Sequence, residues 1–391
     1  MKYTLLENQG FPKKLLYTLA VVAGISVANL YYNQPLLDVI REELNCSEID
    51  TNHIALFTQI GYALGLFFII PLGDLYSRKR ITLTCFTLLV FSLLCIAYAK
   101  NIFYIHAASV VTGACSVIPQ IFVPLAAQYS EPKNKGRNVG FIISGLLTGI
   151  LASRVVSGYV GDWLGWRAMY IIAAGMMLIA AAVILYVLPD TQSNFKGKYA
   201  QLMRSLVQLV KDYPSLRIYA VRSALAFGSF MGLWATLAFK MAQAPFYAGS
   251  DEVGALGLCG VAGALSASFV GQLIQQVGVR RFNFIGSSLQ IIAWTLFYFG
   301  ADHYVWLIAG ILIIDIGMQC IQLSNQATVF ALCPSAANRI NTIFMTTYFL
   351  GGSFGTFLAG TAWSVWGWSG VTCSGILLAL LAMAVTRWSK C

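Results

Sequence analysis

The strongest constraint on this chain is a succession of apolar segments, each about as long as a bilayer is thick. A helix needs about 20 mostly apolar residues to cross the hydrocarbon core of a membrane. We place such segments near residues 15–37, 54–73, 81–99, 102–127, 138–161, 167–188, 218–241, 253–276, 282–300, 304–330, 340–362 and 367–387. Short loops join most of them. The sequence therefore predicts an all-α membrane protein with twelve transmembrane helices.

The composition agrees with lipid as the solvent. Apolar and aromatic residues make up 58% of the 391 residues and charged residues 10%, whereas an ordinary soluble domain has about 25% charged residues. A soluble core stops growing near about 250–300 residues, so much of this apolar surface must face lipid. The first apolar stretch is too long for a cleaved signal peptide and lacks a small-residue cleavage site, so we interpret it as the first span.

The placement of basic residues predicts the orientation. Twenty of the 25 Lys and Arg residues fall on the side of the membrane that both termini share, and four fall on the other side: Arg41, Lys100, Arg167 and Lys240. The positive-inside rule then places both termini in the cytoplasm of a multi-pass protein, which we expect in the bacterial inner membrane. The net charge of +10 is explained by this topology, and we predict no nucleic-acid partner.

The motifs that most enzymes need are absent from the sequence. The nine cysteines show no CxxC spacing, which argues against a metal site or a disulfide framework. The three histidines lie far apart, and neither an HExxH motif, a GxSxG motif nor a P-loop occurs. We predict that the protein is not an enzyme, binds no metal and uses no cofactor.

The chain divides into two similar halves. An offset of 202 residues places Arg137 on Arg339, Gly149 on Gly351, and Gly165–Trp166 on Gly367–Trp368. Because the offset covers six helices, the halves are parallel repeats, which is typical of alternating-access transporters, although a channel can also be built from repeats. We expect an N-terminal six-helix bundle over 1–188, a cytoplasmic linker with an amphipathic helix over 189–215, and a C-terminal six-helix bundle over 216–391.

The chain resembles the major facilitator superfamily over essentially its whole length. The loop after the second span reads PLGDLYSRKR from Pro71 to Arg80 and is similar to the motif G-x-x-x-D-R-x-G-R-[KR] at Asp74, Arg78 and Lys79. Within the superfamily, the segments ANLYYNQP, GLLTG and YFLGG resemble the twelve-span drug:proton antiporters of bacteria. The proline and last two glycines of the antiporter signature in span five are absent. The resemblance implies a cytoplasmic gate motif (Gly73, Asp74, Arg78, Lys79, Arg80), although these residues could also serve topology alone.

Two charged residues are predicted near the middle of spans, Arg154 in span five and Asp315 in span ten. A charge at this depth costs at least about 2.5–3.5 kcal/mol on insertion scales and so faces protein or water. We hypothesise that Asp315 exchanges protons and that Arg154 competes for it or binds an anionic substrate. The alternative is a static ion pair or a carboxylate hydrogen-bonded to a helix.

Polar and aromatic residues at helical spacing predict the walls of a substrate cavity. Residues four, seven and eleven positions apart share one helix face, as Gln319, Gln322 and Gln326 do with Asp315. The resemblance implies that spans one, four, seven and ten line the cavity. We add the candidates that these spans carry: Asn29, Tyr32, Asn33, His106, Ser116, Gln120, Phe227, Phe230 and Trp234. Such amides can instead tie helices together, and aromatic stripes can be core packing.

These inferences predict a secondary transporter that moves a small organic molecule by alternating access. We expect a monomer that exports its substrate in exchange for protons. The first alternative is a proton-coupled importer of a metabolite. The second is a transporter-like sensor or scaffold that binds a ligand without flux.

Overall fold

The computed structural model describes residues 5, 7, 10–190, 197–261, 273, 276–333 and 336–388, and these residues form helices, turns and loops without a β-strand. The first half contains α1 (Lys13–Ala28), α2 (Leu37–Leu44), α3 (Glu48–Phe68), α4 (Arg78–Tyr98), α5 (Ile102–Cys115), α6 (Pro119–Tyr129), α7 (Lys135–Leu164) and α8 (Trp166–Val187). The second half contains α10 (Pro214–Ala242), α11 (Ser250–Leu256), α13 (Val279–Phe299), α14 (Tyr304–Leu332) and α15 (Ala337–Trp388). The helix α9 (Tyr199–Asp212) lies between them in the sequence. The all-α prediction is confirmed.

Nine helical stretches among the described residues are long and apolar enough to cross a membrane. One of them, α15, reverses direction at Gly367 (φ 58°, ψ −145°) and so consists of two helices. The shorter α1 continues through a turn and the 3₁₀ helix η1 (Gln34–Leu36). The described helices thus account for eleven predicted spans. The predicted span 253–276 begins as α11 and η4 (Gly257–Cys259), and most of its remainder lies outside the described residues.

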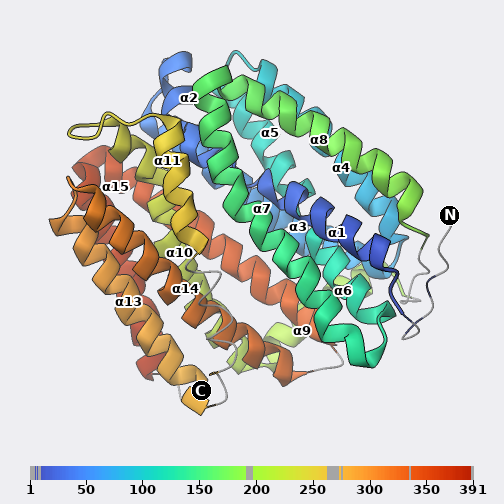
Figure 1. The fold of residues 1–391 in the computed structure, drawn as a ribbon. Helices are drawn as coiled ribbons and strands as arrows, with labels where there is room; N and C mark the ends of the chain where they lie inside the picture. The colour runs from blue at the N-terminus through green and yellow to red at the C-terminus, as the bar shows by residue number, and fades with distance from the viewer. Residues whose placement is uncertain are drawn as a thin grey trace.

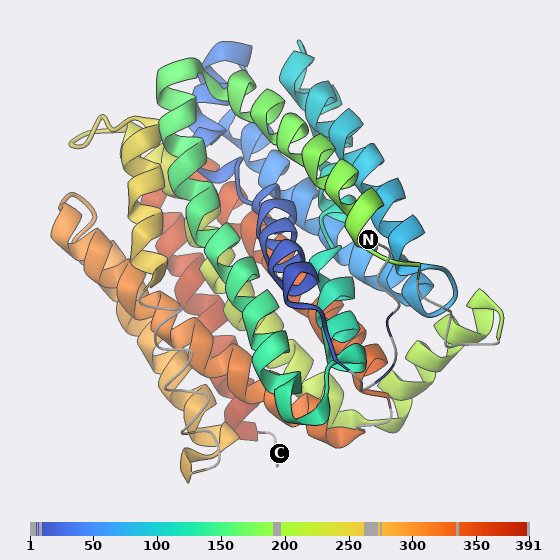
Figure 2. The ribbon, with the colours of Figure 1, turned by 45° about the vertical axis from the view of Figure 1, so that its right-hand side comes forward.

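Figures 1 and 2 show the helices running roughly side by side, with those of the first half (blue to green) against those of the second half (yellow to red). The start of α1 and the end of α15 lie at one end of the bundle, which we call the termini end (Figure 1). The short α2 and the start of α11 lie at the opposite end. The helix α9 extends along the termini end (Figure 2), where the Tyr199 hydroxyl donates a hydrogen bond to the Phe68 carbonyl at 3.0 Å.

Two of the expected spans are broken near the middle of the molecule. The fourth, expected as one helix over 102–127, is interrupted at residues 116–118 before Pro119 begins α6. The first is interrupted at residues 29–33, just before Pro35 in η1. Proline has no backbone N–H and cannot continue the hydrogen bonding of a preceding helix, but it suits a first turn. Gln34, directly after the first break, donates to the Met231 sulfur of the other half at 3.9 Å, so this break lies at the contact between the halves.

Glycines bring pairs of helices into backbone contact in each half. A Cβ on Gly149 in α7 would lie 2.2 Å from the carbonyl oxygen of Gly24 in α1. A Cβ on Gly355 in α15 would lie 2.0 Å from the carbonyl oxygen of Gly228 in α10. Small residues permit this approach, as in other membrane helix pairs.

The glycine contacts relate the two halves by a different offset from the 202 residues that the sequence suggested. The offset of 202 aligns Gly149 with Gly351, whereas the helix contacts make Gly149 equivalent to Gly355. The difference of four residues is close to one helical turn of about 3.6 residues, so both glycines present the same helix face. The offset of 202 still holds where the helices end, because Gly165 and Gly367 both adopt positive φ.

The two halves close against each other near the opposite end. The Trp363 indole N–H donates to the Glu48 carboxylate at 2.7 Å, and the Asn52 amide donates to the Ala235 carbonyl at 3.0 Å. Nearby, α7 meets α11, where the Ser250 hydroxyl donates to the Gly158 carbonyl at 2.9 Å. These contacts close the bundle at that end, and we call them the seal.

Candidate substrate cavity

A cavity of about 150 Å³ lies between the halves in the middle of the bundle. Side chains from both halves line it, including the only two mid-span charges that the sequence singled out. Its polar lining consists of Gln120, Arg154, Asp315, Gln319 and Gln322, with the hydroxyls of Tyr31, Tyr62 and Tyr348. Its apolar lining includes Leu146, Ile150, Phe227, Phe230, Met231, Met318, Met345 and Phe349. The cavity therefore offers opposite charges within a largely apolar wall.

Arg154 is held in one orientation by its neighbours. Its side chain is 3% exposed, and its Nε donates to the Gln34 side-chain oxygen at 2.6 Å. The guanidinium lies 4.0 Å from the centre of the Trp234 ring and 5.1 Å from the centre of the Tyr31 ring. A cation placed over an aromatic face gains about 0.5–2 kcal/mol when it is shielded from water. The break in the first span brings Gln34 and Tyr31 to this position.

Asp315 is buried, and the residues that the structure describes leave part of its carboxylate without a hydrogen bond. The residue is 8% exposed, and its Oδ2 atom has no hydrogen-bond partner among the described residues. Arg154 interacts with it electrostatically, but these two described side chains form no salt bridge. A buried polar group without a partner costs about 1–3 kcal/mol, and a charged one more. The carboxylate is therefore in a site that favours binding a proton or a cation.

The two charges lie at a similar depth on opposite halves. Arg154 lies ten residues before the end of α7, and Asp315 lies eleven residues after the start of α14. At about 1.5 Å per residue, both are roughly 15 Å along their helices from the opposite end. A molecule in the cavity is thus able to contact both.

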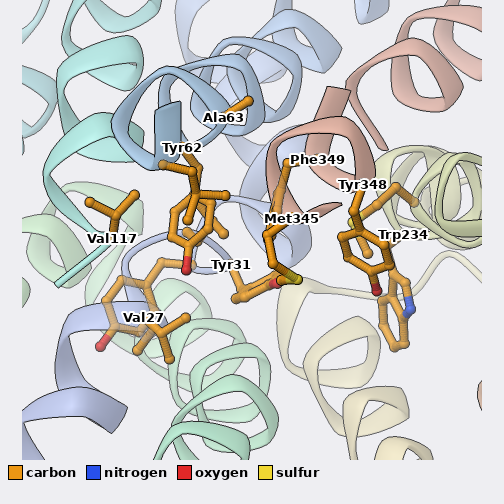
Figure 3. Packing of buried hydrophobic residues seen from close by; sticks show 14 of the residues in the cluster. Val27, Tyr31, Tyr62, Ala63, Val117, Trp234, Met345, Tyr348 and Phe349 are labelled. Atoms are coloured by element: carbon orange, nitrogen blue, oxygen red, sulfur yellow. The ribbon is translucent and has the colours of Figure 1, made fainter. Parts of the chain in front are cut away.

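Aromatic side chains of both halves meet around the cavity. Figure 3 shows Tyr31 and Tyr62 beside Met345, Tyr348 and Phe349. The ring of Tyr62 lies 4.3 Å from that of Phe349, and the ring of Tyr348 stacks on Phe227 at 3.8 Å. The Tyr348 hydroxyl also donates to the Gln322 side chain at 2.9 Å. These contacts form an apolar wall of aromatic rings beside Arg154 and Asp315.

The structure brings together about half of the residues that the sequence proposed for the cavity. Those on its wall are Gln120, Phe227, Phe230, Gln319 and Gln322, together with Arg154 and Asp315. Trp234 does not line the cavity itself, but its ring stacks on Arg154, which does. Gln326 lies nearer the termini end, where its amide donates to the Asn341 side chain at 3.3 Å.

The remaining candidates form contacts away from the cavity. Asn29 donates to carbonyls of its own helix and Ser116 donates to the Thr112 carbonyl. Asn33 donates to the Thr58 hydroxyl at 3.2 Å, and Tyr32 is buried in the core beside it. His106 lies near the opposite end, with Nε2 2.7 Å from the Asp50 carbonyl oxygen.

A second hollow lies toward the termini end and shares Gln120 with the central cavity. Gly73, Asp74 and Arg78 of the proposed gate motif line it with Arg339 and Asn341 of the other half. Arg78 donates to the Gln128 side chain at 2.8 Å, and Asp74 interacts electrostatically with Arg78 and Arg339. Lys79 and Arg80 follow at the start of α4. The hollow separates the halves at this end, in contrast to the seal at the other.

Several residues at the cavity were not singled out from the sequence. Tyr31, on the wall, and Gln34, which is not on the wall but accepts a hydrogen bond from Arg154, lie in the segment quoted for the resemblance. The polar residue before Pro35 is a usable signal, because helix breaks in transporters mark binding sites. Tyr348 begins the quoted segment YFLGG, but no helix break marks it. Tyr62 and Met345 give no such signal, since buried aromatic and other apolar residues are common in every span.

Among the described residues, no three His, Cys, Asp or Glu side chains come together in a way that could hold a metal ion. The cavity instead combines buried charges, amides and aromatic rings between two repeats. This arrangement is that of a binding site for a small organic molecule.

Comparison with known proteins agrees with the fold. The family model described as Major Facilitator Superfamily matches residues 19–356. The chain belongs to this superfamily. The resemblance inferred from the loop after the second span is thereby confirmed.

Two relatives of this major facilitator illustrate the match. A protein of Escherichia coli O157:H7 named "Uncharacterized transporter YgaY" is 34% identical over 97% of this chain and 96% of its own length. The "Probable transporter SCO4007" of Streptomyces coelicolor is 29% identical over 90% of this chain and 82% of its own. Among solved structures, the nucleoside transporter NupG superposes with a TM-score of 0.73 at 15% identity, covering 96% of this chain and 100% of that one. The family and its members are transporters, so the protein is a membrane transporter and not an enzyme.

Proposed function

We propose that this major facilitator exports a small organic molecule in exchange for protons, with Asp315 as the proton-carrying group. The observation that supports this is the buried carboxylate of Asp315, which faces the cavity between the halves without a hydrogen-bond partner among the described residues. The resemblance to drug:proton antiporters agrees with this direction of transport.

Only some states of the protein can change the side from which the cavity is open at low cost. An uncompensated carboxylate at membrane depth is costly, so the empty cavity reorients at lower cost after Asp315 takes a proton. A bound substrate that neutralises or screens Asp315 provides the other low-cost state. Alternation between these two states couples substrate flux to proton flux, since each ligand lowers the cost of only its own form.

The proposed orientation follows from the basic residues, which are concentrated at the termini end. We place both termini in the cytoplasm and the chain in the bacterial inner membrane, where it acts as a monomer because each chain has its own cavity. In this orientation the seal between Trp363 and Glu48 is periplasmic, and the state described is inward-facing. We propose the boundaries 1–188, 189–215 and 216–391 for the two bundles and their linker.

The orientation is open to a direct test with reporter fusions. Green fluorescent protein folds in the cytoplasm but not after export through the general secretion route in an unfolded form. We expect a fusion after the last residue to fluoresce, and a periplasmic alkaline phosphatase fused there to be inactive. An active phosphatase and a dark fluorescent protein would reverse the orientation.

The coupling test uses everted membrane vesicles with an imposed proton gradient and a fluorescent pH reporter. Drugs, nucleosides, sugars and amino acids are added in turn to the wild type, to Asp315→Asn and to the control Asp212→Asn, whose carboxylate lies on the exposed side of α9. We expect at least one compound to dissipate the gradient with the wild type and the control. With Asp315→Asn the same compound is expected to have no effect.

Three other outcomes would change the assignment. Equal substrate flux with the wild type and Asp315→Asn, without proton movement, would indicate facilitated diffusion. Proton movement in the same direction as the substrate would indicate a symporter, the alternative that uses the same residues. A ligand that binds without flux would favour the sensor.

A further inference from the structure

The geometry points to a zwitterion as the substrate: its amine binds Asp315, its carboxylate binds Arg154, and its apolar body lies against the aromatic wall. This inference rests on the proposed transport function for the role of the cavity, and it names the class of molecule that the cavity accepts. An amino acid with an aromatic side chain is the simplest molecule of this class.

The first observation is the free hydrogen-bonding capacity of Asp315. The residue is more than nine-tenths buried, lines the cavity, and leaves Oδ2 without a partner among the described residues. An ionised carboxylate accepts hydrogen bonds only. A primary ammonium offers three donors and a positive charge, so it fits this position better than a neutral group does.

The second observation is that Arg154 is oriented but not saturated. Its Nε is occupied by Gln34, and its plane is held against the rings of Trp234 and Tyr31. Its terminal nitrogens make no hydrogen bond to any residue that the structure describes. A planar guanidinium with free terminal donors matches a carboxylate in two-point geometry. The fixed plane reduces the conformational entropy lost on binding.

The third observation is that the opposite charges lie on different halves and do not pair directly. Each lines the same cavity at a similar depth. A ligand with one charge would satisfy one of them and leave the other buried and unmatched, which is unfavourable. A zwitterion satisfies both and leaves the cavity neutral. It also bridges α7 and α14, so its binding is sensitive to how the halves are placed.

The fourth observation concerns the remaining wall. Phe227 and Tyr348 stack at 3.8 Å, and Tyr62 packs on Phe349 at 4.3 Å. Met231, Met318 and Met345 complete the apolar lining. Aromatic and thioether groups make favourable contacts with a flat ring. The body of the zwitterion is therefore apolar and preferably aromatic.

The test compares three probes that share a phenyl ring and differ in charge. They are L-phenylalanine (zwitterion), 2-phenylethylamine (cation) and 3-phenylpropanoate (anion). Binding to the full-length protein in lipid nanodiscs is measured by calorimetry at neutral pH. We expect L-phenylalanine to bind about tenfold or more tightly than either single-charge probe, because each lost charged hydrogen bond costs at least that factor.

The variants assign each charge to its partner. Asp315→Asn is expected to remove the preference for phenylalanine over 3-phenylpropanoate while keeping the preference over 2-phenylethylamine. Arg154→Gln is expected to give the reverse pattern. Arg154→Lys keeps the charge but not the planar fork, so it should retain part of the preference. Asp212→Asn is the control and should bind all probes as the wild type does.

The wild-type comparison keeps the inference falsifiable even if a variant does not fold. Equal binding of phenylalanine and 2-phenylethylamine would remove Arg154 from the site, and equal binding of phenylalanine and 3-phenylpropanoate would remove Asp315. Binding of none of the probes would overturn the inference. Charge-selective binding without flux in vesicles would reject the proposed transport and keep the inference, whereas proton-coupled flux of a compound with a single charge would do the opposite.

Discussion

Gly149→Leu is expected to prevent α1 and α7 from packing and so to destabilise the first half. The atoms within 2.2–2.5 Å of an added Cβ are the backbone O, C and Cα of Gly24, which cannot rotate away. Overpacking of a well-packed core costs about 1–3 kcal/mol when side chains can adjust. Because two backbones must separate here, we expect the upper end of that range or more.

The measurement is the fraction of protein that elutes as a single species in fluorescence-detected size exclusion after heating. The control is Gly140→Leu on the same helix, where no atom lies within 4 Å of an added Cβ. This control should behave as the wild type does. Gly355→Leu should fail in the same way as Gly149→Leu, because Gly228 takes the place of Gly24. Wild-type heat stability of both variants would contradict the close backbone contacts described above.

Gly158→Trp is expected to fold but to lose transport by about fivefold or more. The first Cβ would already lie 2.4 Å from the Ser250 carbonyl oxygen and 2.9 Å from Cα of Gly254, both in the other half. An indole at this position keeps the seal at the opposite end open. A penalty of about 1–3 kcal/mol on the sealed state shifts the equilibrium about five- to more than a hundredfold toward the state that is open at the opposite end.

Transport is measured in the everted vesicles, and ligand binding is measured in nanodiscs. Transport should fall while binding persists, because the cavity remains accessible from one side. Gly175→Trp on α8 is the control, since an added Cβ there meets no atom within 4 Å. Transport at the wild-type rate in Gly158→Trp would show that the contact between α7 and α11 does not have to form during the cycle.

The type and approximate bounds of the described helices were predictable because lipid imposes a minimum length and an apolar composition on each span. The interruptions were less predictable. Pro119 and Pro35 both mark breaks, yet a proline inside a span can also be tolerated, as Pro124 is within α6. The register of the repeat was missed by one turn because residues four positions apart present the same helix face, so sequence matching alone does not separate them.

The cavity residues that carry a charge were predictable, because a charged side chain in the middle of a span is unfavourable unless it faces protein or water. Arg154 and Asp315 are the clearest case, and Gln319 and Gln322 follow from their spacing on the same helix. Polar residues that bond to their own helix were misleading. Ser116 and Asn29 donate hydrogen bonds to carbonyls of their own helices. No sequence pattern distinguishes such a hydroxyl or amide from one that faces a ligand.

The one-residue connection between α7 and α8 links the site to the elastic properties of the bilayer. Gly165 alone joins the two helices. Close to this connection, Arg167 of α8 donates to the Ala97 and Ala99 carbonyls at the end of α4, both at 2.8 Å. The helix α8 exposes Leu178, Ile179 and Tyr186 on its outer surface. When membrane thickness changes, a spanning helix tilts to keep its apolar length matched. We therefore expect a tilt of α8 to move α7 and the Arg154 guanidinium that it carries, so that lipid chain length would act on the same equilibrium as the transported molecule.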